Sequence, residues 1–260
     1  MNDFGYFEAL LQNFKVVNDT QSENIEKAVK LMAEAIANDG ILFGQRAREM
    51  AEAVMIHMVP LVNPDGVDLV NGAAKPEEKQ LAQSLAERYP AIPFPEGWKA
   101  NLVGVDLNLN YPAGWLMARE IKFSQGYTRP GPRDYVGRAP LDQMETKALA
   151  ELTERLDPDL VLAYHSQGKE IYWQFKDYVV PGAEALGKVM ARVSGYTLAD
   201  TPYASSFAGF KDLFIQNYRR PGYTIEVGIG ENPLPLSQFP EIYRDNVPLL
   251  NISAIGIKSS

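Results

Sequence analysis

The chain has 260 residues, of which 46% are hydrophobic, and this composition is enough to bury one sizeable core. A single compact domain over residues 1–260 is therefore expected. The 33 acidic and 25 basic residues give a net charge of -8, and the basic residues form no stripe, which argues against nucleic acid as a partner. The absence of cysteine excludes disulfides, thiolate zinc sites and cysteine nucleophiles.

The N-terminal segment, MNDFGYFEALLQNFKVVND, lacks the features of an export signal. It has no basic region leading into an apolar one, and no window of the chain reaches 18 uninterrupted apolar residues. The simplest prediction is a soluble, cytoplasmic chain with no membrane partner. The oligomeric state is left open.

The first half of the chain contains two helix patterns and two strand patterns. Residues 22–37 carry apolar side chains at helical spacing and predict an amphipathic helix. Residues 53–62 form an apolar run stopped by the turn signal NPDG, and they predict a buried strand in which His57 packs. A helix is expected at 76–89, and residues 104–109 have the composition of a strand before a Pro/Gly turn.

Helices and strands alternate through the second half. The predicted elements are a helix at 141–155, a strand at 158–166, helices at 182–194 and 207–218, a strand at 222–228 and a terminal helix at 237–255. This alternation predicts an α/β fold with a mixed, mostly parallel sheet flanked by helices. No repeat, linker or low-complexity tract divides the chain.

Polar residues follow the predicted strands at the points where the strands end. Asp65, Asn108, His165 and Glu226 each lie at or just after such an end. Binding sites of open α/β sheets collect at the carboxyl edges of their strands. These four positions are therefore the first candidates for a functional site.

His165 and Glu226 each admit a functional and a structural interpretation. His165 can be a metal ligand, a general base or a histidine satisfied within the core. Glu226 interrupts an apolar strand, where a carboxylate is costly to bury without a partner. It is either half of a buried salt bridge or a general base of raised pKa that faces a metal-bound water.

Four motifs together resemble a known family. They are VPLVNPDGVDLV at 59–70, GVDLNLNYPAGW at 104–115, AYHSQG at 163–168 and RRPGYTIEVGIGENPLPLSQFPEIY at 219–243. Their order and spacing resemble the zinc carboxypeptidases related to carboxypeptidase A. They are most similar to the bacterial branch that cleaves γ-D-glutamyl bonds to diaminopimelate or lysine in peptidoglycan peptides. The resemblance spans residues 38–250 and implies a zinc cofactor and a peptide or muropeptide substrate.

The resemblance also implies roles for individual residues. His165 corresponds to the third zinc ligand, and Glu226 to the general base that takes a proton from the zinc-bound water. Asn108 resembles the asparagine that helps to hold a substrate carboxylate. Tyr203 is the candidate for the mobile tyrosine that caps the substrate, within one or two positions. Asp212 matches an aspartate that orients a zinc-bound histidine.

The chain departs from the family in its first two zinc ligands, which the family takes from a His-x-x-Glu segment. An ungapped count places that segment at 15–18 (KVVN), and a second register places it at 5–8 (GYFE). Neither supplies a His/Glu pair, and the other histidine, His57, is expected to pack in its strand. The family's N-terminal strands also have few residues here from which to form, so a family-type ligand set is incomplete and binding of zinc is doubtful.

The residues expected to contact substrate differ as well. The arginine that follows the asparagine in true carboxypeptidases is replaced by Leu109, which disfavours release of ordinary C-terminal residues. Only Lys99 stands near the place of an arginine that would polarise the scissile carbonyl. Arg133 and Arg138 either contribute positive charge for an acidic muropeptide or are simply solvated.

Two functions follow from these observations. The first is a zinc metallopeptidase, of carboxypeptidase type, that hydrolyses γ-D-glutamyl-diamino acid bonds in peptidoglycan peptides and is inactive unless its metal site is completed. The second is a pseudoenzyme that binds muropeptides without cleaving them. A serine hydrolase is disfavoured because no Gly-x-Ser-x-Gly motif is present.

Overall fold

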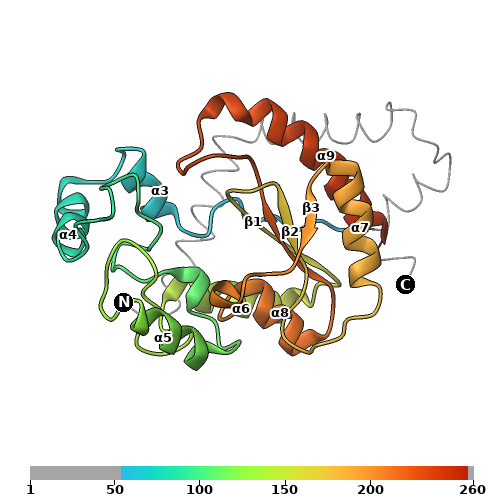
Figure 1. Ribbon diagram of the computed structural model, residues 1–260, viewed down its shortest axis with the longest axis horizontal. Helices are drawn as coiled ribbons and strands as arrows, with labels where there is room; N and C mark the ends of the chain where they lie inside the picture. Colours follow the sequence, from blue (N-terminus) through green and yellow to red (C-terminus); the bar gives the residue numbers. More distant parts are fainter. Residues whose placement is uncertain (1–53, 257–260) are drawn as a thin grey trace.

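The computed structural model describes residues 54–256, with a four-stranded sheet at their centre (Figure 1). The helices are α3 (Pro64–Val70), α4 (Pro76–Ala86), α5 (Trp115–Ser124), α6 (Met144–Leu156), α7 (Ala183–Ser194), α8 (Phe210–Tyr218) and α9 (Phe239–Gly256). The strands are β1 (Val161–His165), β2 (Glu170–Tyr172), β3 (Thr197–Ala199) and β4 (Gly222–Glu226). Short 3₁₀ helices lie at Leu107–Leu109, Tyr203–Ser205 and Leu236–Gln238.

The order of the strands in the sheet is β1-β4-β2-β3. β1 is parallel to β4, and β2 is parallel to β3, whereas β2 runs antiparallel to β4. This confirms the predicted mixed, mostly parallel sheet. Because the direction reverses between β4 and β2, the ends of β1 and β4 lie beside the start of β2.

One face of the sheet is covered by α7 and α9 (Figure 1). Ile171 of β2 and Tyr223 and Ile225 of β4 are fully buried, and they form a hydrophobic cluster with Met190 of α7 and Leu249 of α9. These contacts follow from the β-strand alternation, which places every second residue on the same face. Both helices thus contribute apolar side chains to the same cluster as the strands.

The opposite face is covered by α8. A Cβ atom added at Gly222 would lie 3.3 to 3.4 Å from α8 side chains, so the helix packs closely on this strand. Gly222, Thr224 and Glu226 alternate along β4 with Tyr223 and Ile225, which face α7 and α9, and they therefore point to this side. The carboxylate of Glu226 thus belongs to the α8 face of the sheet, at the end of β4.

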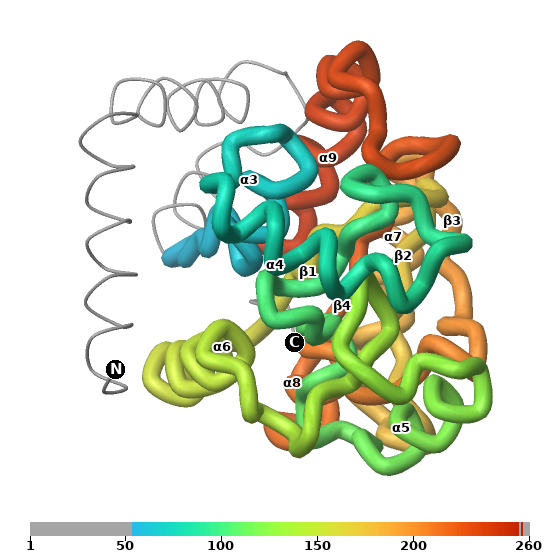
Figure 2. Tube along the Cα trace, turned by 90° about the vertical axis from the view of Figure 1, so that its left-hand side faces the viewer, coloured from blue at the N-terminus to red at the C-terminus, as the bar shows by residue number. Residues whose placement is uncertain are grey.

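Helices α3 and α4 form a smaller unit beyond β1, as Figures 1 and 2 both show. Their core consists of six buried residues, namely Leu69, Ala82, Leu85, Ala86, Trp98 and Ala100. Trp98 and Ala100 come from the segment that follows α4, so this unit holds residues 98–101 in place. That segment includes Lys99.

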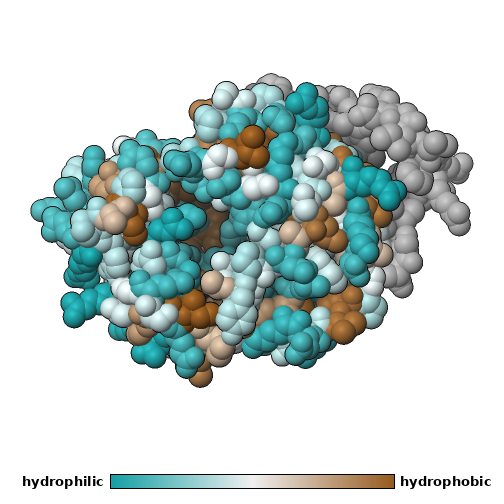
Figure 3. Space-filling model, viewed as in Figure 1, coloured by the Kyte–Doolittle hydropathy of each residue, from teal (hydrophilic) through white to brown (hydrophobic). Residues whose placement is uncertain are grey.

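The prediction of a buried strand at 53–62 is wrong for the residues that are described, 54–62. They form no strand, and Met55, Ile56 and Met58 are 79%, 52% and 57% exposed. His57 is exposed as well and does not pack as predicted. A strand needs a hydrogen-bonded neighbour, and none of the residues 54–256 pairs with this segment. Figure 3 shows a hollow with a hydrophobic floor where this segment crosses in Figure 1.

The NPDG motif was also misread, because it begins a helix and does not form a turn. Asn63 is the N-cap of α3, and its side chain accepts a hydrogen bond from the Gly66 amide at 3.1 Å. Proline at the first helical position is favourable because its missing N–H has no partner in the helix. Asp65 therefore lies in the first turn of α3 and not at a strand end.

The strand expected at 104–109 is wrong too. Its backbone bonds to neighbouring loops, with Val105 N donating to the Asn101 side chain at 3.0 Å and Asp106 N donating to Tyr135 O at 2.8 Å. The last three residues of this stretch form the 3₁₀ helix Leu107–Leu109. The side-chain pattern of this stretch is typical of a strand, but its backbone groups form hydrogen bonds with loops and not with another strand.

The other helices and strands of the second half are confirmed near their predicted bounds, and so is the helix at 76–89, which ends at Ala86. The elements α5, β2 and β3 were not predicted. The helix expected at 22–37 lies outside the described residues. Within residues 54–256, no helix is long and apolar enough to cross a membrane.

Candidate active site

His165 and Glu226 lie side by side at the ends of two neighbouring strands. They are register partners in the parallel pair β1/β4, and the Val227 amide just after β4 donates to His165 O at 2.8 Å. Partners in register point to the same face of a sheet. Both side chains are half-buried on the α8 side. The structure therefore brings the imidazole and the carboxylate to one place.

Burial dominates the electrostatics of this pair. Burial raises the pKa of the Glu226 carboxyl to about 7. The positive charge of Lys99 lowers this pKa in part, and the negative charge of Glu170 raises it further. Burial also lowers the pKa of the His165 imidazole to about 4, and Lys99 adds to that effect. At neutral pH the imidazole is therefore uncharged, and the carboxyl can both take up and release a proton.

Glu170 is a member of the site that the sequence did not reveal. It is the antiparallel register partner of Glu226, so His165, Glu226 and Glu170 form one row across β1, β4 and β2. The Tyr172 hydroxyl donates a hydrogen bond to Glu170. The alternation of Glu170, Ile171 and Tyr172 is the signal that could have indicated this short strand, with its polar side chains facing the site.

Lys99 is exposed, and its ammonium group is close enough to lower the pKa values of both His165 and Glu226. Asn63 fixes the backbone that carries it, because the Asn63 amide donates to Ala100 O at 2.9 Å and to Lys99 O at 3.3 Å. The amides of Lys99 and Ala100 both donate to Pro132 O. The NPDG motif thus helps to hold the lysine that faces the site.

Asn108 and Asp212 meet at the start of α8. Asn108 Oδ1 accepts from Phe210 N at 3.3 Å, and Asp212 Oδ2 accepts from Gly209 N at 3.1 Å. Asp212 Oδ1 lies 2.6 Å from Lys211 Nζ, and both of these side chains are buried. No hydrogen bond among residues 54–256 joins Asp212 to His165. In this structure the aspartate caps its own helix and pairs with its neighbour.

Three further candidates lie at the surface. Tyr203 is 66% exposed. Its ring packs edge-to-face against the ring of Phe207, with 5.2 Å between the two ring centroids. Arg133 Nε donates to Asp134 Oδ2 at 2.9 Å, so its charge is already paired. Arg138 is mostly solvated. None of the three is in hydrogen-bonding contact with the described residues of the His165/Glu226 row.

The described residues do not supply a complete metal centre. The row offers one imidazole, and residues 54–256 contain no group of three or more His, Cys, Asp or Glu side chains arranged to hold a metal. The whole sequence has two histidines and no His-x-x-Glu motif, and His57 is exposed. The two registers considered for that motif, at 5–8 and 15–18, lie outside the described residues.

The arrangement agrees with a comparison against known protein families. Residues 41–248, most of the chain, match the zinc carboxypeptidase family, peptidase M14. The chain belongs to this family. Peptidases of the family depend on zinc. The match includes every residue of the His165/Glu226/Glu170 row and Lys99.

Two curated relatives agree with this assignment. The chain is 41% identical over 211 residues to γ-D-glutamyl-L-diamino acid endopeptidase 1 of Lysinibacillus sphaericus, which covers 81% of the chain and 52% of the relative. It is 40% identical over 203 residues to the uncharacterised protein YqgT of Bacillus subtilis strain 168, which covers 77% of the chain and 52% of the relative. The chain thus spans about half the length of the curated relatives it matches.

A solved structure supports the fold. The carboxypeptidase A of Helicoverpa armigera is similar with a TM-score of 0.54 and 18% identity, over 78% of this chain and 51% of that chain. This likeness concerns the fold alone, and it agrees with the mixed sheet and flanking helices described above.

Proposed function

We propose that the protein is a zinc peptidase that hydrolyses the bond between γ-D-glutamate and a diamino acid in peptidoglycan peptides. The observation that carries the proposal is the register pairing of His165 with Glu226 at the ends of β1 and β4. Family membership supports a metallopeptidase, and the relative named as a γ-D-glutamyl-L-diamino acid endopeptidase supports this substrate class.

Each residue of the site has chemistry that suits hydrolysis of an amide. With a pKa of about 7, the Glu226 carboxylate can accept a proton from the attacking water and return it to the leaving amine nitrogen. The exposed ammonium of Lys99 supplies positive charge for the oxygen of the scissile carbonyl as negative charge develops there. Neutral His165 has a nitrogen lone pair available for a metal. A zinc ion at this place would need further ligands besides His165, because residues 54–256 contain no complete ligand group.

A second function is favoured by one observation, the single imidazole of the row. A peptide-binding groove that keeps Glu226, Glu170 and Lys99 but holds no zinc would make the protein a muropeptide-binding pseudoenzyme. The two functions share the substrate and differ in the metal. Zinc binding therefore discriminates between them.

The first prediction is that zinc binds with micromolar or tighter affinity and that His165→Ala weakens this binding at least about tenfold. His57→Ala is the matched control, because His57 is the other histidine of the chain and is exposed. Isothermal titration of zinc into each purified variant measures the effect. Peptide binding without zinc binding in the wild type would establish the pseudoenzyme, and equal zinc affinity in both variants would remove His165 from the metal site.

The second prediction is that Lys99→Met lowers kcat/KM for a γ-D-glutamyl-diaminopimelate peptide by about 10- to 100-fold. The reason is the loss of positive charge beside Glu226 and His165. Lys79→Met, at an exposed position of α4, is the control and should leave the rate unchanged. Product release followed by chromatography provides the measurement. Equal rates for the two variants would show that Lys99 has no part in the reaction.

A further inference from the structure

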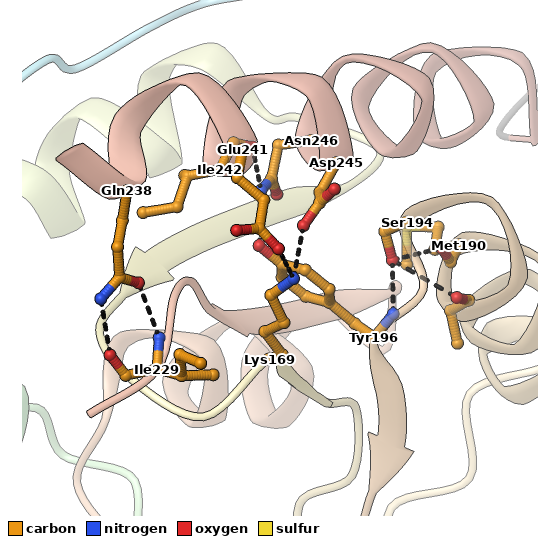
Figure 4. Close-up of polar contacts among 11 residues, drawn as sticks. Lys169, Met190, Ser194, Tyr196, Ile229, Gln238, Glu241, Ile242, Asp245 and Asn246 are labelled. Carbon is orange, nitrogen blue, oxygen red and sulfur yellow. Dashed lines mark hydrogen bonds and ion pairs between the residues drawn. The ribbon is translucent and has the colours of Figure 1, made fainter.

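Two connecting segments leave the candidate active site, and one is fastened to α9 while the other is fastened to Gln238, the last residue of the 3₁₀ helix that leads directly into α9. The turn 166–169 follows His165, and the loop 227–233 follows Glu226. Figure 4 shows the first turns of α9 above these segments, with Glu241 and Asp245 directed at Lys169 and Gln238 directed at Ile229. The residues next to the site are thus held from the far side of the sheet.

Lys169 makes the first of these attachments. Its Nζ atom lies 2.7 Å from Glu241 Oε1 and 2.9 Å from Asp245 Oδ2, two carboxylates one helical turn apart on α9. It also lies 5.8 Å from the centre of the Tyr196 ring. The hydrogen bonds to Glu241 and Asp245 hold the pKa of Lys169 above its usual value. One cation shared by two carboxylates, of which Asp245 is partly buried and Glu241 is exposed, is more restrained than an isolated surface pair.

The backbone of Lys169 indicates that this attachment determines the shape of the turn. Its φ of 52° is in the left-handed region, which is unfavourable for a residue with a Cβ atom and which glycine adopts freely. Such a conformation persists where surrounding contacts fix it. Here the side chain is held by α9, and the carbonyl accepts a hydrogen bond from Thr197 N at 2.9 Å. A lysine at this position supplies a contact that a glycine could not.

Gln238 makes the second attachment. Its Oε1 accepts from Ile229 N at 3.0 Å, and its Nε2 donates to Ile229 O at 2.8 Å, so one side chain satisfies both backbone groups of that residue. The helix itself is anchored, because Leu249 is buried against α7 and Asn246 Nδ2 donates to the Tyr196 hydroxyl at 2.9 Å. A fixed helix is a suitable support for two loops.

The two segments are also bonded directly to each other. Gly168 N donates to Gly228 O at 2.9 Å. Ser166 Oγ donates to Asn232 Oδ1, and Asn232 Nδ2 donates to Ser166 O, both at 2.9 Å. The turn after β1, the loop after β4 and the helix α9 therefore form a closed ring of contacts around the end of the site.

We propose that Lys169 is a positioning residue of the site. Through its ion pairs with Glu241 and Asp245 it fixes the turn that joins His165 to Glu170, and it thereby sets the imidazole and the two carboxylates of the row relative to one another. The catalytic meaning of this role rests on the proposed function. The role itself concerns geometry and is measurable without any activity.

The test compares Lys169→Met and Lys169→Arg with Lys188→Met. Lys188 is the matched control, since it is exposed and pairs with Glu184 at 2.7 Å within α7 itself. The first readout is the NMR signal of the His165 ring, which has to be distinguished from only one other histidine, His57. The second readout is the hydrogen exchange rate of the Gly168 amide, which reports the bond to Gly228.

Lys169→Met is expected to shift or split the His165 ring signal and to speed exchange at Gly168 by about tenfold or more. The His57 signal should not move. Lys169→Arg should be much less perturbed than Lys169→Met, because arginine keeps a positive charge that can donate to both carboxylates. An unchanged His165 signal and an unchanged exchange rate in Lys169→Met would overturn the proposal. So would equal changes in Lys188→Met, or an arginine variant as perturbed as the methionine variant.

Hydrolysis separates this inference from the proposed function. If the wild type cleaves a γ-D-glutamyl-diaminopimelate peptide, Lys169→Met should lower kcat by about tenfold and leave KM within about twofold, because the groups that react are misplaced while substrate contacts remain. A change confined to KM would contradict the positioning role. If the wild type cleaves no such peptide, the proposed function fails, and the ring signal and the exchange rate still decide the role of Lys169.

Discussion

Replacing Glu226 with glutamine is expected to abolish hydrolysis and, in the absence of metal, to stabilise the fold at pH 8. Loss of the general base should lower kcat by about 10³-fold, because glutamine cannot accept the proton of the attacking water. The gain in stability has a different cause. The Glu226 carboxyl has a pKa of about 7 in the folded protein because it is buried, and its ordinary value is 4.5.

The direction of the pH effect follows from these two values. Between about pH 5 and pH 7 the folded protein retains a proton on Glu226 that the unfolded chain has lost, so the free energy of unfolding falls as the pH rises through this window. Glutamine is neutral at every pH. The variant should match the wild type near pH 5 and exceed it by on the order of 2 kcal/mol at pH 8, after allowance for the partial exposure of Glu226.

Urea denaturation at pH 5 and pH 8 measures this difference, with Glu87→Gln at the exposed end of α4 as the control. The acid side supplies an internal check. The pKa of His165 is lowered to about 4 in the fold, so both proteins should lose stability as the pH falls from about 6.5 towards 4. If the variant is no more stable than the wild type at pH 8, burial does not destabilise the charged form of the Glu226 carboxylate. Undiminished hydrolysis would exclude Glu226 as the base.

The second large effect is expected at Asn110, whose side chain is fully buried. Its Nδ2 atom donates to Val136 O at 2.9 Å, to Ala139 O at 3.0 Å and to Asp142 Oδ1 at 2.9 Å, and its Oδ1 accepts from Thr146 Oγ1 at 2.8 Å. Asn110→Ala removes all four of these hydrogen bonds, although Val136 O keeps a bond from Trp115 Nε1 and Asp142 Oδ1 keeps one from Gln143 Nε2. The expected loss of stability is about 3 kcal/mol, because each lost hydrogen bond contributes about 0.5–1.5 kcal/mol.

The matched control for this change is Asn217→Ala. Asn217 is exposed on α8, so its replacement should change the free energy of unfolding by less than about 0.5 kcal/mol. Thermal and urea denaturation of both variants at pH 7 provide the comparison. Equal stabilities for the two variants would mean that the contacts of Asn110 are replaced by water or by movement of the 136–142 loop.

The helices and strands that the sequence predicted correctly are those whose apolar pattern lies within a single segment of the chain. The helices at 76–89 and 141–155 carry apolar residues at helical spacing, and the strands at 158–166 and 222–228 are short, mostly apolar segments next to turn residues. Segment 54–62 has the same apolar character, yet it forms no strand. The composition of a segment shows that it is suited to pair as a β-strand. Whether a partner strand lies within hydrogen-bonding distance depends on the rest of the fold.

The same distinction applies to the site. His165 and Glu226 were found because they stand in recognisable motifs at the ends of predicted strands. Glu170 was missed because its strand has three residues and its place in the row comes from pairing with a strand more than fifty positions away. Lys99 had a weak sequence signal, and its closeness to the site depends on the Asn63 contacts and on the α3–α4 unit.

The turn at 166–169 has a strict length requirement that follows from the register of β1, β2 and β4. Because neighbouring residues of a strand face opposite ways, adding or deleting one residue between His165 and Glu170 would turn the Glu170 carboxylate towards α7 and α9. The connection from β4 to α9 is held by contacts of Gly228, Ile229 and Asn232, and it is under no such restriction between Asn232 and Gln238. Among relatives of this protein, variation in loop length should therefore be tolerated between Asn232 and Gln238 and suppressed after His165.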